Sequence, residues 1–402
     1  MDPHTPSRPC WVEVCTRTLE DNFRFLRSLA PLESELLAVV KADAYGHSLS
    51  ICAPAFVHAG ANWLGVTSVE EGAAARALCP NANILVIGGV FPGQASSVLQ
   101  HRLTPSVWEP YQLDELESAS RAANASPQSV PVNLELDTGM SRQGVSLDSD
   151  ALHATLARFT STSPLKLEGL MTHLYAADES NGDATAVQLA RLGVALTQIF
   201  ALGHRPEWLN VGNSAALLSG QAGPITQLAA RHGMKPLLRP GIALYGLAPR
   251  FEPDEPVHVA SARGHLQPAL AWKSQVVSVR SVPAGAVVGY NGTFIATEPM
   301  RLALVAVGYA DGLDRSLSNR FSLLVRGQRA PIAGRISMDQ TVLDVTEIAA
   351  VQPGDEVVII GEQGRESGGH ESISAFDHAD ATGTIPWEVF TRIAARVRRI
   401  AS

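Results

Sequence analysis

Eight short apolar runs, separated by segments with helical periodicity, constrain the fold of this chain more than any other feature. Runs of four to six residues bounded by turn residues are typical of strands in a parallel sheet. Eight strand–helix repeats within about 200 to 250 residues predict an α/β fold, a (β/α)8 TIM-type barrel. An open doubly wound sheet is the alternative, and no G-x-G-x-x-G or Walker loop follows any run to support it. The runs cover residues 36–40, 63–67, 84–87, 103–107, 132–136, 167–172, 208–211 and 236–239.

The pattern changes after Gly246. Residues 249–257 are rich in proline and charge, which indicates a linker. Later apolar runs, such as 274–280 and 356–360, are separated by Gly, Pro and Asp turns and predict a mainly β domain. We expect a cofactor-binding barrel domain over 1–248, whose first strand near 11–15 could join the second domain, and a mainly β domain over 249–402. A final helix is expected over 387–396.

Composition narrows the class of protein. The formal net charge is −8 and the chain has no dense Lys/Arg block, which disfavours nucleic acid and anionic membranes as partners. Its four cysteines form no CxxC pair or zinc spacing, so we expect no metal and a reducing compartment. No apolar stretch reaches the roughly 18 residues of a membrane helix, and no secretory signal is evident. These features predict a soluble cytoplasmic protein.

The segment Leu37–His47 has the sharpest local pattern, because Lys41 ends an apolar strand and a glycine-containing turn follows. On a barrel, the carboxyl ends of the strands form the catalytic face. A lysine that points into such a site is costly unless its charge is used or its pKa falls, and Schiff-base formation is one such use. A surface lysine with only its stem buried is the alternative.

The same segment resembles the pyridoxal-phosphate lysine motif of alanine racemases, and the resemblance continues in order along nearly the whole chain. The matching segments are 132–145, 169–173 with 177–178, 212–215, 238–247, 282–293, 307–312 and 334–340. The resemblance implies an isomerase that interconverts L-alanine and D-alanine, with pyridoxal 5'-phosphate as cofactor and D-alanine for peptidoglycan as product. It also implies a homodimer in which Tyr290 and Met338 reach the partner's site.

By the same resemblance, Lys41 holds the cofactor and Tyr290 is the second catalytic base. Racemisation removes a proton from one face of the α-carbon and returns one to the other, so two bases must flank it. A free phenol has a pKa near 10, which nearby cations would lower; His173 and Arg239 are the candidates. An aromatic residue packed at a hairpin turn is the alternative for Tyr290.

The resemblance also implies cofactor-binding, substrate-binding and supporting residues. Arg239 is expected to donate to the pyridine nitrogen, because a guanidinium effectively never gives up its proton. Arg142 is the expected clamp on the substrate carboxylate, with the backbone amide of Met338. The cofactor-binding residues are Lys41, Tyr45, His173, Asn213, Ser214, Arg239, Gly241, Ile242 and Trp387. The supporting residues are Glu135, Asp178, Tyr309, Arg315 and Asp339.

Three positions depart from the family's pattern. Glu135 stands where the family often has a carbamylated lysine, and we expect its carboxylate to act on Arg142 directly. Trp387 replaces a tyrosine that touches the phosphate, so we expect Trp387 at the phosphate or the pocket mouth. Asn210 replaces a histidine, and a neutral amide cannot give cationic support to Arg239.

Other functions stay open on the sequence. A broad-specificity racemase that also accepts serine differs only in the volume of its pocket. A non-catalytic barrel protein that carries pyridoxal phosphate would stop after the barrel, whereas this chain continues into the domain of Tyr290. An amino acid decarboxylase of the same architecture would lack a base placed like Tyr290.

Overall fold

The computed structural model describes residues 8–365 and 368–402, which fall into two compact units. The barrel unit comprises residues 17–44 and 49–267, and the β unit comprises residues 8–16, 45–48 and 268–402. The division thus falls at 267/268, 19 residues after the boundary at 248/249 expected from composition, and α11 (Val257–His265) lies in the barrel unit. Strand β1 (Cys10–Val14) belongs to the β unit.

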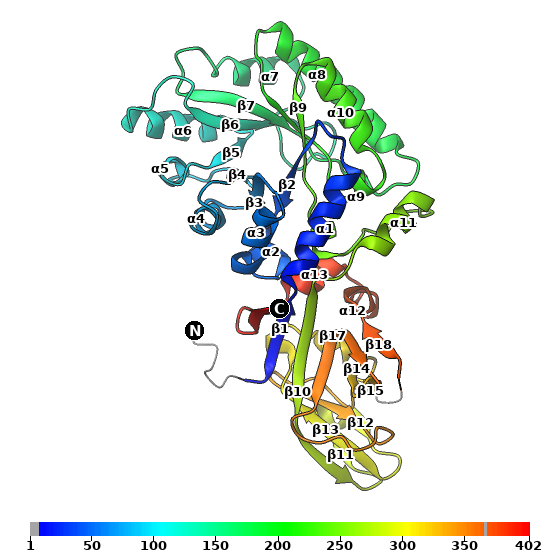
Figure 1. The fold of residues 1–402 in the computed structure, drawn as a ribbon. Coiled ribbons are helices and arrows are strands. Elements are labelled where there is room, and N and C mark those ends of the chain that lie inside the picture. The colour runs from blue at the N-terminus through cyan, green and yellow to red at the C-terminus, as the bar shows by residue number, and fades with distance from the viewer. Residues whose placement is uncertain (1–7, 366–367) are drawn as a thin grey trace. The chain divides into compact units, whose positions relative to one another are not determined.

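A closed barrel of eight parallel strands forms the centre of the barrel unit, which confirms the predicted (β/α)8 fold (Figure 1). Each strand pairs with the next, and β9 pairs back with β2. In three of the strands every residue is buried, and in three more every residue but the first is buried. Their continuous apolar sequences require this burial. The strands are β2 (Glu35–Val39), β3 (Trp63–Val66), β4 (Asn83–Val86), β5 (Thr104–Val107), β6 (Val130–Glu135), β7 (Leu165–Met171), β8 (Trp208–Asn210) and β9 (Lys235–Leu238).

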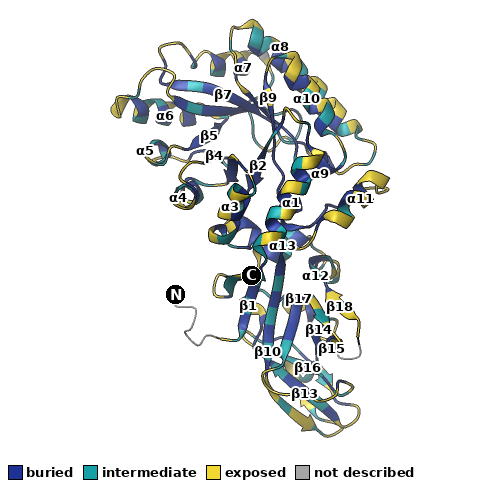
Figure 2. Cartoon of the chain, viewed as in Figure 1, coloured by how far each residue is buried: buried dark blue, intermediate teal, exposed yellow. Residues whose placement is uncertain are grey.

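Helices surround these strands, most of them with one buried and one exposed face, whereas α9 is buried throughout (Figure 2). They are α1 (Thr16–Leu29), α3 (Leu49–His58), α4 (Val69–Leu78), α5 (Ala95–Gln100), α6 (Pro110–Ala122), α7 (Ser149–Leu156), α8 (Asp183–Ala201), α9 (Ser214–Leu218), α10 (Ala222–Arg231) and α11 (Val257–His265), with the 3-10 turn η1 (Ile242–Tyr245). By length and composition α8 could cross a membrane, unlike the expectation from the sequence. One such helix is weak evidence, and α8 connects β7 to β8 as a barrel helix.

The β unit is built on a sheet in which β10 pairs with β1, β13 and β17. Its strands are β1, β10 (Leu270–Val282), β13 (Met300–Val305), β14 (Ser322–Val325), β15 (Gln328–Pro331), β16 (Thr341–Asp344), β17 (Glu356–Gly364), β18 (His370–Ile373) and β19 (Arg398–Ala401). A separate hairpin pairs β11 (Val287–Val288) with β12 (Phe294–Ile295). Short turns η2 (Tyr290–Gly292), η3 (Tyr309–Asp311) and η4 (Arg315–Leu317) and helix α12 (Ala375–Thr382) complete the unit.

The last helix is shorter than its sequence predicted. Helix α13 (Pro386–Thr391) ends five residues before the expected end at 396, and residues 398–401 form strand β19, parallel to β1. The Arg399 guanidinium donates to the carbonyl oxygens of Ile393, Ala394 and Val397 at 2.6 Å each. These bonds satisfy the backbone after α13 without further helical turns.

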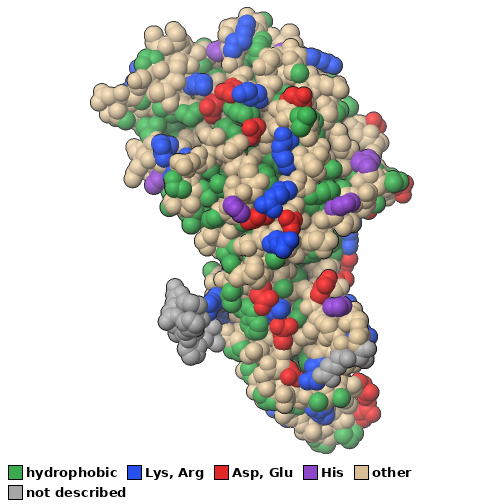
Figure 3. All heavy atoms as spheres, viewed as in Figure 1, with side chains coloured by type: hydrophobic (Ala, Val, Ile, Leu, Met, Phe, Trp, Pro, Cys, Tyr) green, Lys and Arg blue, Asp and Glu red, His purple; other side chains and the backbone are tan. Residues whose placement is uncertain are grey.

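Charged side chains of both signs are interspersed on the face shown in Figure 3, with no broad field of a single sign there.

Candidate active site

Lys41 lies just beyond the carboxyl end of β2 and is partly buried. Burial lowers the pKa of its amine, as do the positive charges of Arg142 and Arg239, whereas the negative charge of Glu71 opposes them. The strand end is fixed from within the barrel unit, because the Tyr245 hydroxyl donates to the carbonyl oxygen of Val39 at 2.9 Å. The structure thus holds an amine with an increased neutral fraction at the catalytic face of a barrel.

The chain makes a left-handed turn immediately after this lysine, over the segment labelled α2 (Lys41–Tyr45) in Figure 1. The φ angles of Ala42, Asp43 and Ala44 are 53°, 51° and 56°. Left-handed helical backbone costs L-residues roughly 1 to 2 kcal/mol each. Because strain of this kind persists only where surrounding contacts hold it, it is a mark of functional sites.

Arg239 follows β9 and is almost completely buried. One terminal nitrogen donates to the backbone and side-chain oxygens of Asn210, at 2.6 and 2.5 Å. The other donates to the carbonyl oxygen of Thr172 at 2.9 Å and to Nδ1 of His173 at 3.3 Å. Burial lowers the pKa of Arg239 to about 10, which leaves it protonated at neutral pH. Among the residues that the structure describes, none accepts a hydrogen bond from Nε–H of Arg239, so this N–H is the donor left for a ligand.

His173 follows β7 and is neutral at physiological pH. Burial and the charges of Arg239, Arg142 and Lys41 lower its pKa to about 3. Its backbone is held by Gln188 of α8, whose amide donates to the His173 carbonyl oxygen at 2.9 Å. A neutral imidazole accepts a hydrogen bond from Arg239 but offers no positive charge to a phenolate. Of the two cations proposed from the sequence to act on Tyr290, Arg239 is therefore the charged one.

Arg142 lies on the loop after β6. Backbone hydrogen bonds join the two ends of this loop. Asp137 N–H donates to the Val145 carbonyl oxygen at 3.0 Å, and Val145 N–H donates to that of Glu135 at 2.8 Å. At the neck of the loop, Gly144 has a φ of 119°, and a Cβ there would lie 2.5 Å from the Asp137 nitrogen. The loop therefore presents Arg142 from a fixed base, and the Arg142 side chain is exposed.

Glu135 is buried at the end of β6, where burial raises the pKa of its carboxyl group. Its Oε2 accepts a hydrogen bond from the side-chain amide of Gln143 at 2.7 Å. The sequence led us to expect a direct contact between Glu135 and Arg142. Among the described residues, the side chain that donates to the Glu135 carboxylate is instead Gln143, which follows Arg142 in the sequence. The Glu135 carboxylate acts on Arg239 and Arg142 through its charge.

Ser214 begins α9, after β8, and its hydroxyl oxygen accepts hydrogen bonds from the backbone N–H groups of Gly241 and Ala243, at 2.9 and 3.2 Å. Asn213 is the N-cap of the same helix, with its side chain bonded to Ala216 N–H. The loops after β8 and β9 are thereby joined, and the Ser214 hydroxyl keeps its own hydrogen to donate. Ile242 is buried beside this junction.

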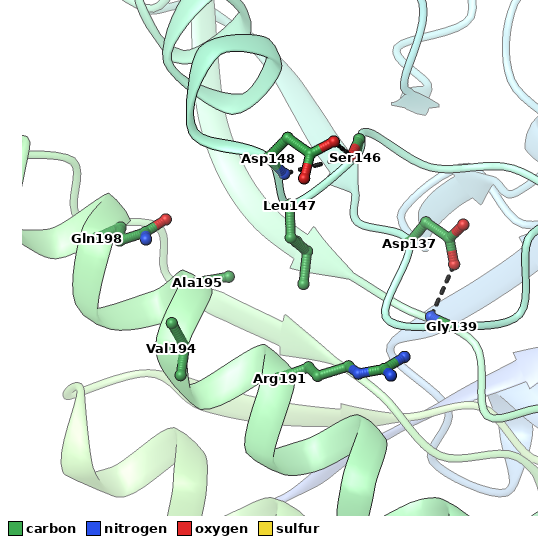
Figure 4. Close-up of a pocket in the computed structure, with 9 residues that line it drawn as sticks. All are labelled: Asp137, Gly139, Ser146, Leu147, Asp148, Arg191, Val194, Ala195 and Gln198. Atoms are coloured by element: carbon green, nitrogen blue, oxygen red, sulfur yellow. Dashed lines mark hydrogen bonds between the residues drawn. The ribbon is translucent and has the colours of Figure 1, made fainter.

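A separate pocket of about 480 Å³ lies between the loop after β6 and helix α8 (Figure 4). Asp137 and Arg191 line it, and Arg191 donates to the Thr138 carbonyl oxygen at 3.1 Å. Neither Lys41 nor Arg239 lines this pocket. It therefore contacts the outer residues of the loop that carries Arg142 and does not contain the site residues predicted from the sequence.

The β unit holds all but one of the other predicted residues. Tyr290 lies on the turn between β11 and β12 and is 67% exposed, and Met338 is 53% exposed. Tyr309, Arg315 and Asp339 are exposed, and Trp387 of α13 is partly buried. Tyr45, in the segment 45–48 assigned to this unit, is buried, which raises the pKa of its hydroxyl. Asp178, in the barrel unit, is exposed.

Asp311, which was not among the predicted site residues, organises the turn that carries Met338. This fully buried carboxylate accepts hydrogen bonds from Arg8 at 2.5 Å and Arg396 at 2.8 Å. Both arginines also bond to Asp339, through its backbone and side-chain oxygens respectively. An Asp–Gly step within the motif 307–312 was visible, but which arginines it meets depends on the fold.

The donor set fits a phosphorylated aromatic aldehyde. An amine with a lowered pKa, a fixed guanidinium N–H and a hydroxyl next to two backbone amides lie at the ends of barrel strands. The side-chain Nδ2 of Asn210, beside Arg239, is buried without a partner among the described residues. In the same part of the chain, no three His, Cys, Asp or Glu side chains are grouped to hold a metal.

Comparison with known proteins identifies the family. The domain models "Alanine racemase, N-terminal domain" and "Alanine racemase, C-terminal domain" match residues 14–249 and 269–401. An alanine racemase of Symbiobacterium thermophilum is 38% identical over 394 residues, covering 98% of this chain and 97% of that protein. The alanine racemase of Streptomyces lavendulae aligns with a TM-score of 0.85 at 33% identity, covering 99% and 98% of the two chains. That of Bartonella henselae, with covalently bound pyridoxal phosphate, aligns with a TM-score of 0.80 at 27% identity, covering 99% and 100%. The chain belongs to the alanine racemase family.

Proposed function

We propose that this protein interconverts L-alanine and D-alanine with pyridoxal 5'-phosphate held by Lys41. The observation that carries the proposal is the position of Lys41. It lies just after a barrel strand, and its amine interacts through charge with Arg239, Arg142 and His173. The relative from Bartonella henselae holds the same cofactor covalently. The D-alanine product serves peptidoglycan synthesis in this proposal.

When bound, pyridoxal phosphate supplies an aldehyde that joins amino groups and a ring that accepts the electrons of the substrate's Cα–H bond. Lys41 holds or releases a proton at Nζ, and its lowered pKa favours the neutral amine that a base requires. Tyr290 moves a proton at its hydroxyl on the opposite face. Arg239, through its Nε–H, would hold the ring nitrogen, and the Ser214 hydroxyl would hold the phosphate. Arg142 and the Met338 amide bind the substrate carboxylate.

We further propose a homodimer with shared sites. Tyr290 is 67% exposed on its hairpin, and Val287 and Ile295 of the same hairpin are 65% and 56% exposed. A proton-transferring phenol needs a site from which water is excluded, and exposed apolar side chains need a cover. A second copy of the chain would provide both.

A cytoplasmic location is proposed because the four cysteines form no disulfide in the structure, whereas secreted proteins tend to form disulfides. Detection of the protein in the soluble cytosolic fraction of lysed cells tests it.

A chiral assay of the purified protein against a panel of L-amino acids tests the reaction. We expect racemisation of alanine above serine and larger substrates, with absorbance typical of enzyme-bound pyridoxal phosphate. Racemisation of many amino acids at similar rates would favour the broad-specificity enzyme. Cofactor binding without any racemisation would favour a carrier, and loss of carbon dioxide would favour a decarboxylase.

A further inference from the structure

The left-handed turn after Lys41 is held by two carboxylates. Asp43 Oδ1 accepts a hydrogen bond from Leu49 N–H, the first residue of α3, at 2.6 Å. Glu71 Oε1 accepts one from Ala42 N–H at 2.7 Å, at the residue where the left-handed backbone begins. Asp43 thus secures the turn to the helix that follows it in sequence, whereas Glu71 reaches it from another element.

Glu71 uses both carboxylate oxygens on backbone amides. Its Oε2 accepts a hydrogen bond from Thr67 N–H at 2.8 Å, just after β3. Glu71 is the third residue of α4, whose N-cap is Ser68. In a capping box a glutamate here would return to the N–H of its own cap residue. Glu71 instead ties the ends of two adjacent strands, β2 and β3, to each other.

The charge of Glu71 also faces Lys41. The charged or titratable groups that act on this amine or respond to it are Arg142, Arg239, His173 and Glu71. Both arginines oppose protonation of the amine, and His173 is neutral. Among the groups that act on the Lys41 amine, the Glu71 carboxylate is therefore the one that favours its protonation.

We propose that Glu71 is a positioning residue for Lys41, which sets the direction of the amine by holding the left-handed turn and offsets the field of the two arginines. Glu71 acts through Lys41 and the backbone. The inference rests on the proposed role of Lys41 in holding pyridoxal phosphate.

The variant Glu71→Gln tests the proposal against the matched control Glu70→Gln. Glutamine has one side-chain oxygen, so its amide nitrogen would face the second N–H donor and one bond would be lost. Glu70 precedes Glu71 in the same helical turn, and its substitution removes the same charge. The Glu70 side chain, however, accepts a hydrogen bond from the Gln94 side-chain amide. We expect the dissociation constant of pyridoxal phosphate to rise about tenfold or more in Glu71→Gln and to stay unchanged in Glu70→Gln.

The apoprotein gives a second readout that does not depend on activity. The pH dependence of Lys41 modification by an amine reagent, followed by mass spectrometry, should shift to lower pH in Glu71→Gln alone. Wild-type affinity and wild-type Lys41 titration in folded Glu71→Gln would overturn the proposal. If that variant does not fold, amide hydrogen exchange of the wild-type apoprotein decides: protection of the Ala42 and Thr67 amides supports the proposal, and exchange at the rate of open loops overturns it.

Failure of the proposed function has a different signature. Borohydride reduction of the wild-type holoenzyme should fix the cofactor on Lys41. A label elsewhere, or none, would refute the role of Lys41 itself. A label on Lys41 combined with unaltered Glu71 variants would refute this inference alone.

Discussion

At the scale of single residues, Glu135 has a buried carboxyl group whose charge interacts with those of Arg239 and Arg142 and whose ionisation costs stability. Its carboxyl group has a raised pKa, so its contribution to folding stability is present below the ordinary carboxyl pKa near 4.3 and is lost as pH rises through the raised value. The Glu135→Gln apoprotein should therefore be at least as stable as wild type at pH 7.5, by urea unfolding. Its advantage should disappear near pH 4.

The same substitution should weaken substrate binding, because Arg142 and Arg239 lose a compensating charge. We expect a higher KM for alanine in Glu135→Gln, and wild-type activity that does not respond to added bicarbonate. Bicarbonate-dependent activity of the wild type would show that Glu135 does not replace the family's carbamylated lysine.

The contribution of His173 to folding stability depends on pH in the opposite direction. Its pKa is about 3 in the folded state and about 6.5 in the unfolded state, so its contribution to stability is present above pH 6.5 and lost as pH falls. His173→Asn keeps an acceptor for Arg239 but cannot titrate. Between pH 7 and pH 5, wild-type apoprotein should lose up to about 2 kcal/mol relative to this variant. Parallel stability curves in urea would contradict a neutral, buried His173.

At the scale of elements, the loop that carries Arg142 depends on Gly144. Alanine there would combine a φ of 119° with a Cβ 2.5 Å from the Asp137 nitrogen. We expect Gly144→Ala to lose about 1 to 3 kcal/mol of unfolding free energy and to raise KM through Arg142. The control is Gly93→Ala, where φ is 85° but no atom lies within 4 Å of the Cβ. Equal KM values in the two variants would argue against a role of the loop neck in substrate binding.

The barrel could be predicted from the sequence because its strands are buried and therefore apolar along their length. Every predicted run corresponds to one of β2 to β9. The last helix was predicted too long, because the helical period of residues 392–396 gave no sign that Arg399 would bond to the carbonyl oxygens there. The local sequence pattern determines where a helix ends only if no side chain from elsewhere in the chain hydrogen-bonds to its backbone carbonyl groups.

Contacts between elements were beyond sequence reasoning for the same reason. Ser68 and Glu71 read as an ordinary capping box, and nothing near them in sequence indicates a bond to Ala42. Gln143 and Gln188 have no chemical signature that separates them from surface amides. The resemblance to alanine racemases named the candidate reactive residues, whereas the residues that hold them required coordinates.

At the scale of the whole molecule, shared sites predict that two inactive variants restore each other. Lys41→Ala and Tyr290→Phe, co-expressed with different tags, should form mixed dimers with one complete site. With random pairing, half the dimers are mixed, and activity should recover to about a quarter of wild type. Each variant expressed alone is the control. A mixture as inactive as its parents would show that both residues of a site come from one chain.

The central claim is that an amine and a phenol exchange protons with opposite faces of one α-carbon. The most direct measurement is the conversion of enantiopure L-alanine in deuterium oxide, followed by chiral separation and mass spectrometry. The account predicts D-alanine with one deuterium on Cα, and no such product from Lys41→Ala or Tyr290→Phe. Absence of D-alanine, or D-alanine that keeps the original hydrogen, would contradict it.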